Sequence, residues 1–295
     1  MIYDDVVDLR SYFSEIGLWP NQLALNPRGW MTNFSNEDLD VATALLRTFV
    51  YMNQDMIEKL STAAYIRLSA LKADSDTAEQ IEPEWARFSS RVLISHPVSI
   101  PANSADSGHM FVRVLRDHAA IDEGRILNPD ELALELHRRV ESVPVVFADD
   151  FSGTGTQFLR TLNADRPDGS GGATSIAAEV ERLGGEDYYY VPAVISHAAR
   201  IRVNAESRFR VSAGNVLPES ASALHPRTYL VPAAMRSRLS DFIAKYSDLA
   251  GIPVPDRYGY KDSALAIAFA HGVPNNSLPI FSWKDNGWIP LIARP

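Results

Sequence analysis

The stretch VVFADDFSGTGTQF, residues 145–158, indicates the fold class of this chain. Apolar residues 145–148 lead into Asp149 and Asp150, and small residues with two Gly-Thr steps follow before a second apolar segment. An apolar run without alternation is typical of a strand buried on both faces of a parallel sheet. In open parallel sheets, ligands bind beyond the carboxyl ends of the strands. The stretch therefore predicts a binding site at a strand–loop–helix corner.

The loop after the two aspartates has the composition of a phosphate-binding turn. It consists of Ser152, Gly153, Thr154, Gly155 and Thr156. Its backbone N–H groups lie ahead of a predicted helix, where unpaired amides and the helix dipole favour an anion. The alternative is a plain corner with capping threonines and a solvated acid pair. No lysine follows the second glycine and no serine lies between the glycines, which excludes a Walker loop and a nucleophile elbow.

The two aspartates are expected to have different tasks. Successive side chains of a strand point to opposite faces, so Asp149 and Asp150 are not expected to chelate one atom together. One can accept hydrogen bonds from sugar hydroxyls, while the other orders the loop or reaches a hydrated Mg²⁺, which prefers oxygen ligands. The sequence does not identify the residues that would hold this metal.

Composition limits the chemistry and the partners. The 295 residues include no cysteine, which excludes disulfides, thiolate zinc sites and thiol nucleophiles. The formal net charge of -9 disfavours phosphate backbones, so direct nucleic-acid binding is not expected. No apolar run approaches the roughly 20 residues of a membrane span, and the N-terminus is acidic where a secretory signal would be basic. We therefore expect a cytoplasmic protein without membrane attachment.

The hydrophobic pattern predicts an α/β fold: a parallel sheet with flanking helices, preceded by an N-terminal helical region. Residues 1–90 follow helical spacing, and residues 91–295 alternate apolar runs with helical patterns. Asn128 and Pro129 predict the start of a helix just ahead of the central strand. Pro192, inside a further apolar run, favours an edge strand or a bulge. The strand candidates are VLISHPVSI (92–100), VPVVFADD (143–150), DYYYVPAVISH (187–197) and ALAIAFAH (264–271).

An apolar run, two acids, two spacer residues and GTGT together resemble the phosphoribosyl-diphosphate signature of type I phosphoribosyltransferases. The resemblance implies that Asp149 and Asp150 hold the ribose and serve as the catalytic pair, while the Gly/Thr loop holds the 5-phosphate. It also implies a pyrophosphate loop after the first core strand. That loop would be formed by Ser104, Ser107 and Gly108.

Three segments together resemble a narrower group, a phosphoribosyltransferase-like family of bacterial conflict loci that includes retron-type anti-phage systems. They are RGWMTNF with ALLRTFVYM (within 28–52), DDFSGTGTQF (149–158) and HGVPNNSLPIFSW (271–283). The resemblance implies a toxin-like effector acting on a phosphoribosyl-containing small molecule. It also implies defence-system protein partners or a retron ribonucleoprotein that keeps the effector inactive until infection.

The last of these segments offers candidate base-binding residues. Asn275 and Asn276 carry bidentate amides, and Trp283 offers a stacking face, which together suit a nucleobase. The alternative is a proline-rich tail that closes the core.

One departure from the type I pattern leaves the activity open. Those enzymes carry a flexible hairpin between the pyrophosphate loop and the ribose motif, and it closes over the reacting groups. Between Arg116 and Val143 the sequence predicts mainly one helix, so RPDGSGGATS (166–175) would have to act as the lid. The chain is then either an enzyme acting at the anomeric carbon or a non-catalytic nucleotide-sensing subunit that keeps the phosphate loop. A third reading is an interaction protein that uses its helical region.

Overall fold

The structure is a computed structural model that describes residues 3–21, 24–72, 77–98, 108–119 and 121–293. The chain forms two compact units, which we describe separately. Unit 1 combines Met1–Met56 with Pro218–Pro295, and unit 2 consists of Ile57–Leu217. This division differs from the predicted boundary between residues 90 and 91.

Unit 1 joins the two ends of the chain through strand pairing. Strand β1 (Val50–Met52) pairs in parallel with β9 (Ile267–Phe269), which comes from the predicted strand 264–271. The Trp30 ring stacks on Phe281 at 5.4 Å between centroids, and its Nε1 donates to the Ile280 carbonyl at 2.9 Å. The apolar run 264–271 therefore packs with the N-terminal helices and does not extend the large sheet.

The helices of unit 1 range from three-residue 3₁₀ turns to the 15-residue α12. They are α1 (Tyr3–Glu15), α2 (Pro27–Met31), η1 (Asn36–Asp38), α3 (Leu39–Thr48), η3 (Glu219–Ala221), η4 (Ala233–Met235), α12 (Arg236–Ala250), η5 (Val254–Asp256), η6 (Tyr260–Asp262) and η7 (Pro279–Phe281). Helix α4 (Gln54–Ile66) begins at the junction of the two units.

Unit 2 contains the predicted parallel sheet. The strand order is β2-β3-β6-β7, and β8 pairs with the second half of β6. All of these pairings are parallel. The strands are β2 (Leu93–Ser95), β3 (Val145–Ser152), β6 (Tyr188–Ser196), β7 (Arg210–Val211) and β8 (Asn215–Leu217). A separate antiparallel hairpin is formed by β4 (Arg166–Pro167) and β5 (Ala173–Thr174).

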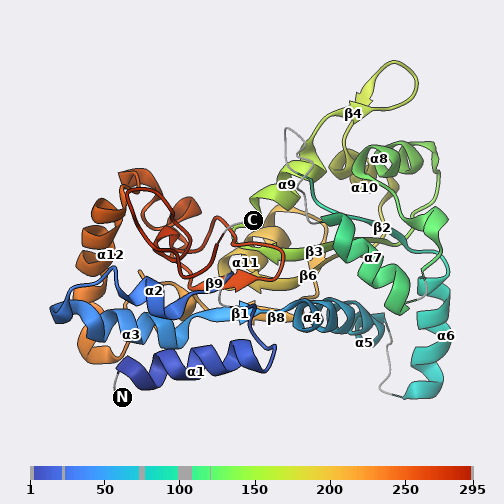
Figure 1. Ribbon diagram of the computed structural model, residues 1–295. Coiled ribbons are helices and arrows are strands. Elements are labelled where there is room, and N and C mark those ends of the chain that lie inside the picture. The colour runs from blue at the N-terminus through green and yellow to red at the C-terminus, as the bar shows by residue number, and fades with distance from the viewer. Residues whose placement is uncertain (1–2, 22–23, 73–76, 99–107, 120, 294–295) are drawn as a thin grey trace. The chain divides into compact units, whose positions relative to one another are not determined.

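Helices cover the sheet of unit 2. They are α5 (Leu68–Lys72), α6 (Ala78–Ser89), α7 (Gly108–Ala119), η2 (Glu123–Arg125), α8 (Pro129–Arg138), α9 (Thr156–Asn163), α10 (Ile176–Leu183) and α11 (His197–Glu206). Side chains of α8, α9, α10 and α11 share one core with Phe147 of β3 and Tyr190 of β6. Figure 1 shows α8, α9 and α10 grouped beside β3 and β6. These contacts build one helical layer on the sheet face that carries Phe147 and Tyr190.

The predicted start of α8 is confirmed. The Asn128 side chain accepts hydrogen bonds from the N–H groups of Asp130 and Glu131, and the Glu131 carboxylate accepts one from the Asn128 N–H. This capping box satisfies amides that would otherwise lack partners, and Pro129 lies where an amide is not needed.

Pro192 lies in the middle of a central strand, so the prediction of an edge strand or a bulge was wrong. Strand β6 pairs with β3 on one side and with β7 and β8 on the other. The Pro192 carbonyl accepts a hydrogen bond from the Gly214 N–H at 3.1 Å. The Ser212 N–H donates to the Tyr190 carbonyl at 2.9 Å, so hydrogen bonds hold the chain to β6 on both sides of the amide that proline lacks.

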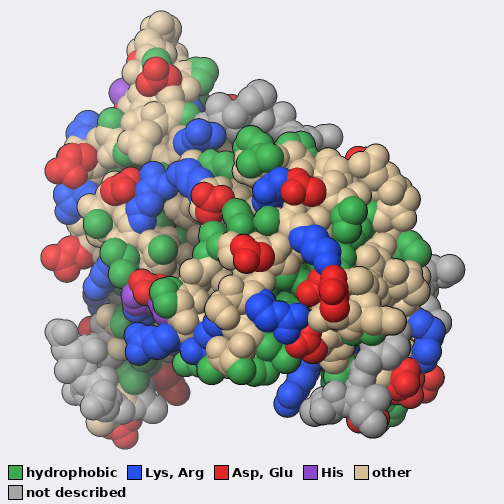
Figure 2. All heavy atoms as spheres, turned by 90° about the vertical axis from the view of Figure 1, so that its left-hand side faces the viewer, with side chains coloured by type: hydrophobic (Ala, Val, Ile, Leu, Met, Phe, Trp, Pro, Cys, Tyr) green, Lys and Arg blue, Asp and Glu red, His purple; other side chains and the backbone are tan. Residues whose placement is uncertain are grey.

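Basic and acidic side chains are interspersed on the face drawn in Figure 2. In unit 1, Arg238 pairs with Asp40 at 2.7 Å and Lys245 pairs with Asp38 at 2.7 Å. A mixture of both signs offers no broad positive field for a phosphate backbone on that face.

We expect Gly214→Ala to destabilise unit 2. A Cβ at Gly214 would lie 2.5 Å from the Leu60 carbonyl oxygen and 2.6 Å from the Ala193 carbonyl oxygen, and both are backbone atoms that cannot turn away. The free energy of unfolding should fall by about 1–3 kcal/mol. Urea unfolding measures this. Gly124→Ala is the control, because its Cβ meets only the Asp122 carboxylate at 3.1 Å in an exposed turn. Equal stability of the two variants would contradict the packing described here.

Candidate phosphate and ribose site

The candidate site lies near the carboxyl end of β3. The strand ends at Ser152, two residues beyond the predicted end at Asp150, so both aspartates are strand residues. The last residue of β2, Ser95, pairs with Phe147, while β3 continues beside β6 to Ser152. Asp149 and Asp150 therefore lie beyond the end of the neighbouring β2. Ser152 is a strand residue and is buried, so its side chain is not part of an open loop.

Asp149 is buried, and both of its carboxylate oxygens accept hydrogen bonds. One carboxylate oxygen accepts the Asp150 N–H at 3.0 Å, and the other accepts the hydroxyl of Tyr190 from β6. The Tyr190 ring is held by Phe158 of α9, stacked at 4.0 Å between centroids. Burial and, next, the neighbouring Asp150 carboxylate raise the pKa of Asp149 well above its ordinary value. Asp149 therefore ties β3 to β6 and α9 at the edge of the site.

Asp150 is partly exposed, and its carboxyl group lies close enough to that of Asp149 for a side-chain hydrogen bond. One of its carboxylate oxygens accepts the Phe151 N–H at 2.7 Å. Of the two aspartates, Asp150 is the one whose side chain solvent reaches. The two aspartates thus differ in burial: Asp149 is buried, and Asp150 is partly exposed.

The loop between β3 and α9 is held from α11. Ser196 Oγ donates to the Gly153 carbonyl at 2.7 Å, and Arg202 Nη1 donates to the Thr154 carbonyl at 3.1 Å. In a planar trans peptide, the carbonyl of one residue and the N–H of the next point in opposite directions. The N–H groups of Thr154 and Gly155 are therefore turned away from α11.

These amides have the character of an anion nest. Across the parts of the chain that the structure describes, no hydrogen-bond acceptor is assigned to the amides of Gly153, Thr154 or Gly155. Gly155 has a φ of +69°, and a Cβ there would lie 3.0 Å from Val203 Cγ2, so glycine suits the conformation and the close approach of α11. Consecutive unpaired amides at a helix N-terminus attract an anion.

The two threonine hydroxyls are linked to one another. Thr154 Oγ1 donates to Thr156 Oγ1 at 3.0 Å, and Arg202 Nη1 also donates to Thr156 Oγ1 at 2.9 Å. Sequence reasoning missed Tyr190, Ser196 and Arg202. The available signal was that the strand candidate 187–197 is parallel to β3, so the helix after it begins at the same sheet edge.

The predicted pyrophosphate loop is placed only in part. Ser104 and Ser107 lie outside the described residues, and Gly108 is the first residue of α7. Between Arg116 and Val143, the described residues form the end of α7, then η2 and α8, with no strand pair that could serve as a lid. The β4–β5 hairpin follows α9 instead, and Thr174 Oγ1 anchors it to the Glu179 carboxylate at 2.7 Å.

The predicted base-binding residues belong to unit 1, whereas the predicted phosphate loop belongs to unit 2. Asn276 is buried, and its amide donates to Ser263 Oγ at 2.7 Å and to the Tyr260 carbonyl at 3.3 Å. Asn275 is exposed, and Trp283 packs against the core of unit 1. The contacts of Asn276 match the alternative reading, in which this segment closes the core.

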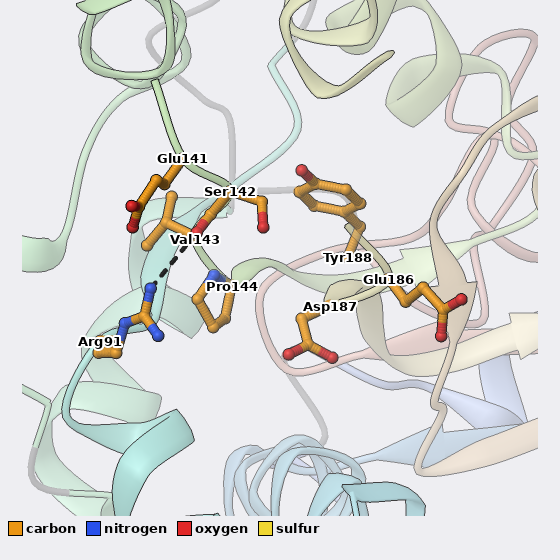
Figure 3. Close-up of a pocket in the computed structure, with 8 residues that line it drawn as sticks. All are labelled: Arg91, Glu141, Ser142, Val143, Pro144, Glu186, Asp187 and Tyr188. Atoms are coloured by element: carbon orange, nitrogen blue, oxygen red, sulfur yellow. Dashed lines mark hydrogen bonds between the residues drawn. The ribbon is translucent and has the colours of Figure 1, made fainter. Parts of the chain in front are cut away.

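A cavity of about 430 Å³ lies at the other edge of the sheet. Figure 3 shows its lining, with Arg91 donating to the Ser142 carbonyl at 3.4 Å, and with Glu186 and Asp187 on the segment just before β6. The lining residues precede β2, β3 and β6, so the cavity is at the amino ends of the strands. It is therefore separate from the aspartates and the loop.

Asp150 is the member of the acid pair that could contribute to a Mg²⁺ ion held jointly with a phosphorylated ligand. Within the described residues there is no group of three or more acidic, histidine or cysteine side chains that could enclose a metal. Mg²⁺ commonly binds through one or two carboxylates plus substrate phosphates and waters. Asp150, as the partly exposed carboxylate beside the loop, is compatible with that mode.

The sequence model of the family PRTase-CE matches residues 27–294. The chain belongs to this family. PRTase-CE proteins are phosphoribosyltransferase-like and associated with conflict systems, which confirms the resemblance and the predicted α/β class. Membership indicates a phosphoribosyltransferase-type function with a phosphoribosyl-type small-molecule ligand. No curated protein and no solved structure matches the chain. None of the helices in the described ranges has the length and apolar character required to cross a membrane.

We expect Asp149→Asn to flatten the pH dependence of stability. A raised pKa means that the folded protein binds the proton more tightly than the unfolded chain, so stability falls as the pH rises above the ordinary value of about 4. Asparagine removes this titration while keeping the shape of the side chain. The difference in melting temperature between about pH 5 and about pH 8 should be smaller than in the wild type.

Asp165→Asn is the matched control, because it removes an exposed carboxylate from the same unit. It should keep the wild-type difference in melting temperature. If Asp149→Asn also kept that difference, the carboxylate would not be the buried, proton-binding group described above.

Proposed function

We propose that this chain is a phosphoribosyltransferase-like effector that binds phosphoribosyl diphosphate or a phosphoribosyl-containing nucleotide and acts at the anomeric carbon. The observation that carries the proposal is that the amides of Thr154 and Gly155 are turned away from α11, in the loop that follows the partly exposed Asp150. An anion nest beside a carboxylate suits a ligand with a phosphate at one end and sugar hydroxyls at the other.

The reaction class follows from the charges. When the bond at the anomeric carbon of a ribose breaks, positive charge develops on the sugar ring. A carboxylate fixed beside the ring stabilises that charge more in the transition state than in the ground state, which lowers the barrier. In this proposal Asp150 supplies the charge, and Asp149 keeps the end of β3 in place through Tyr190.

Mg²⁺ is part of the proposal. Asp150 is the side chain that would contribute a protein ligand, with the remaining ligands coming from the small molecule and water. When bound, the ion would neutralise negative charge on the phosphates.

A non-catalytic nucleotide-sensing subunit is the second candidate. The observation that favours it is the lack of a strand pair among the described residues between Arg116 and Val143, where a closing hairpin would exclude water. A sensor needs the phosphate loop but not the exclusion of water. The loop alone therefore suits both candidates, and turnover distinguishes them.

We extend the proposal to anti-phage defence because the family is associated with conflict systems. An enzyme that consumes nucleotides harms its own cell, so it requires control. Partner proteins or a retron ribonucleoprotein would supply that control, and infection would release it.

The test is to incubate the purified protein, with Mg²⁺, with phosphoribosyl diphosphate, NAD and a panel of nucleotides, and to resolve the products by mass spectrometry. We expect loss of pyrophosphate or of a base with the wild type. Asp150→Asn should lower the rate about tenfold or more, because it removes a charge-assisted contact to the sugar.

Glu186→Gln is the control, because it neutralises a carboxylate at the opposite edge of the same sheet. It should keep the wild-type rate. Binding of a nucleotide without any product, in the presence of cell extract from an infected host, would favour the sensing subunit over the enzyme. Lack of binding to every phosphoribosyl compound would reject both.

A further inference from the structure

Helix α11 contacts the phosphate loop at two points although it follows a different strand. Ser196, the N-cap residue of α11, accepts the Ala199 N–H at 3.0 Å and donates to the Gly153 carbonyl at 2.7 Å. The same hydroxyl thus caps the start of α11 and holds the loop that precedes α9. The loop geometry therefore depends on where α11 starts.

Arg202 makes the second contact with an unusual combination of partners. Its Nη1 donates to the Thr154 carbonyl at 3.1 Å and to Thr156 Oγ1 at 2.9 Å, and both are neutral acceptors. Its Nε pairs with Glu206 at 3.0 Å, but the Glu206 side chain is 52% exposed. An exposed ion pair is screened by water and contributes little.

Glu206 is the anionic partner of Arg202 among the described residues, and it lies outside the loop. A guanidinium keeps its charge at all ordinary pH values, and its planar fork can hold a carbonyl and a hydroxyl at once. The positive end of the α9 dipole lies at the same loop. A neutral sugar gains nothing from these fields, whereas a phosphate dianion gains from both.

We propose that Ser196 and Arg202 are positioning residues of the phosphate loop, and that Arg202 makes the loop select a phosphorylated ribose over the unphosphorylated sugar. This inference rests on the proposed function, because it assumes that the loop receives a sugar phosphate. Ser196 and Arg202 fix the two carbonyls and thereby aim the amides of Thr154 and Gly155, and Arg202 adds the charge.

The experiment measures binding of ribose 5-phosphate and of ribose to the full chain by calorimetry. The variants are Arg202→Gln, Arg202→Lys and Ser196→Ala. Arg202→Gln should weaken ribose 5-phosphate binding about tenfold or more, because it removes a charged donor. Arg202→Lys should recover part of the affinity, since lysine restores the charge but not the fork. Ser196→Ala should weaken binding less than Arg202→Gln, because it leaves the charge in place.

Arg200→Gln is the matched control, because it removes the same charge from the same helix without a contact to the loop. It should bind within about twofold of the wild type, since a general field is screened at physiological salt. Two measurements separate a positioning role from general damage to the fold. A positioning role lowers the affinity for ribose 5-phosphate but leaves ribose binding and the melting temperature unchanged.

Each result decides the inference. If Arg202→Gln binds ribose 5-phosphate as well as the wild type does, or if Arg200→Gln loses as much affinity as Arg202→Gln, Arg202 has no special place. The inference is then overturned while the proposed function stands. If Arg202→Gln does not fold, normal binding by Arg202→Lys together with Ser196→Ala overturns it. If the wild type does not bind ribose 5-phosphate, the inference and the proposed phosphate site fall together.

Discussion

The parallel pairing of β3 with β6 is the constraint on which the site depends. It places residues 145–152 beside residues 188–195, so both strands end at the same edge of the sheet. The helices that follow them must then begin side by side, and α9 and α11 do so. The hydrogen bond from Tyr190 to Asp149 fastens this pairing at the level of the site. The arrangement makes a loop from one β–α connection depend on side chains from the next.

Burial separates the two aspartates that the sequence presents as a pair. A carboxylate inside the sheet is costly unless it is protonated or hydrogen-bonded, and Asp149 has both the bonds and a raised pKa. Asp150, the next residue along the strand, keeps contact with solvent. Adjacent positions on one strand can therefore combine a structural acid with an acid that remains available to a ligand.

Short sequence patterns correctly predicted the elements whose structure depends on a few neighbouring residues. The cap at Asn128, the buried strand at 145 and the helix from Thr156 each follow from a few neighbouring residues. The family could also be predicted from the sequence, because DDFSGTGTQF is a contiguous motif. The aspartates and the loop amides came from that motif and lie together at one strand end.

Other features depend on contacts between distant parts of the chain. The last predicted strand belongs to unit 1 because Ile267 pairs with Val50. No pattern in the sequence near either residue predicts this pairing. Pro192 is tolerated in a central strand because Ser212 and Gly214 donate hydrogen bonds to β6 on either side of the missing amide. Arg202 is one of many arginines in the sequence, and only the position of α11 makes it a partner of the loop. Such features require the strand order before they can be inferred.

The close approach of Gly214 to Leu60 has a consequence for synthesis of the chain. These residues lie near the two ends of unit 2, so folding of that unit brings its ends together. A ribosome completes unit 2 before it makes Pro218–Pro295, while Met1–Met56 has no β9 to pair with until then. Once unit 2 has folded, the remaining halves of unit 1 are tethered at a short separation, which reduces the entropy lost when they meet. Unit 2 is thus able to fold first, and unit 1 can form only after β9 has left the ribosome.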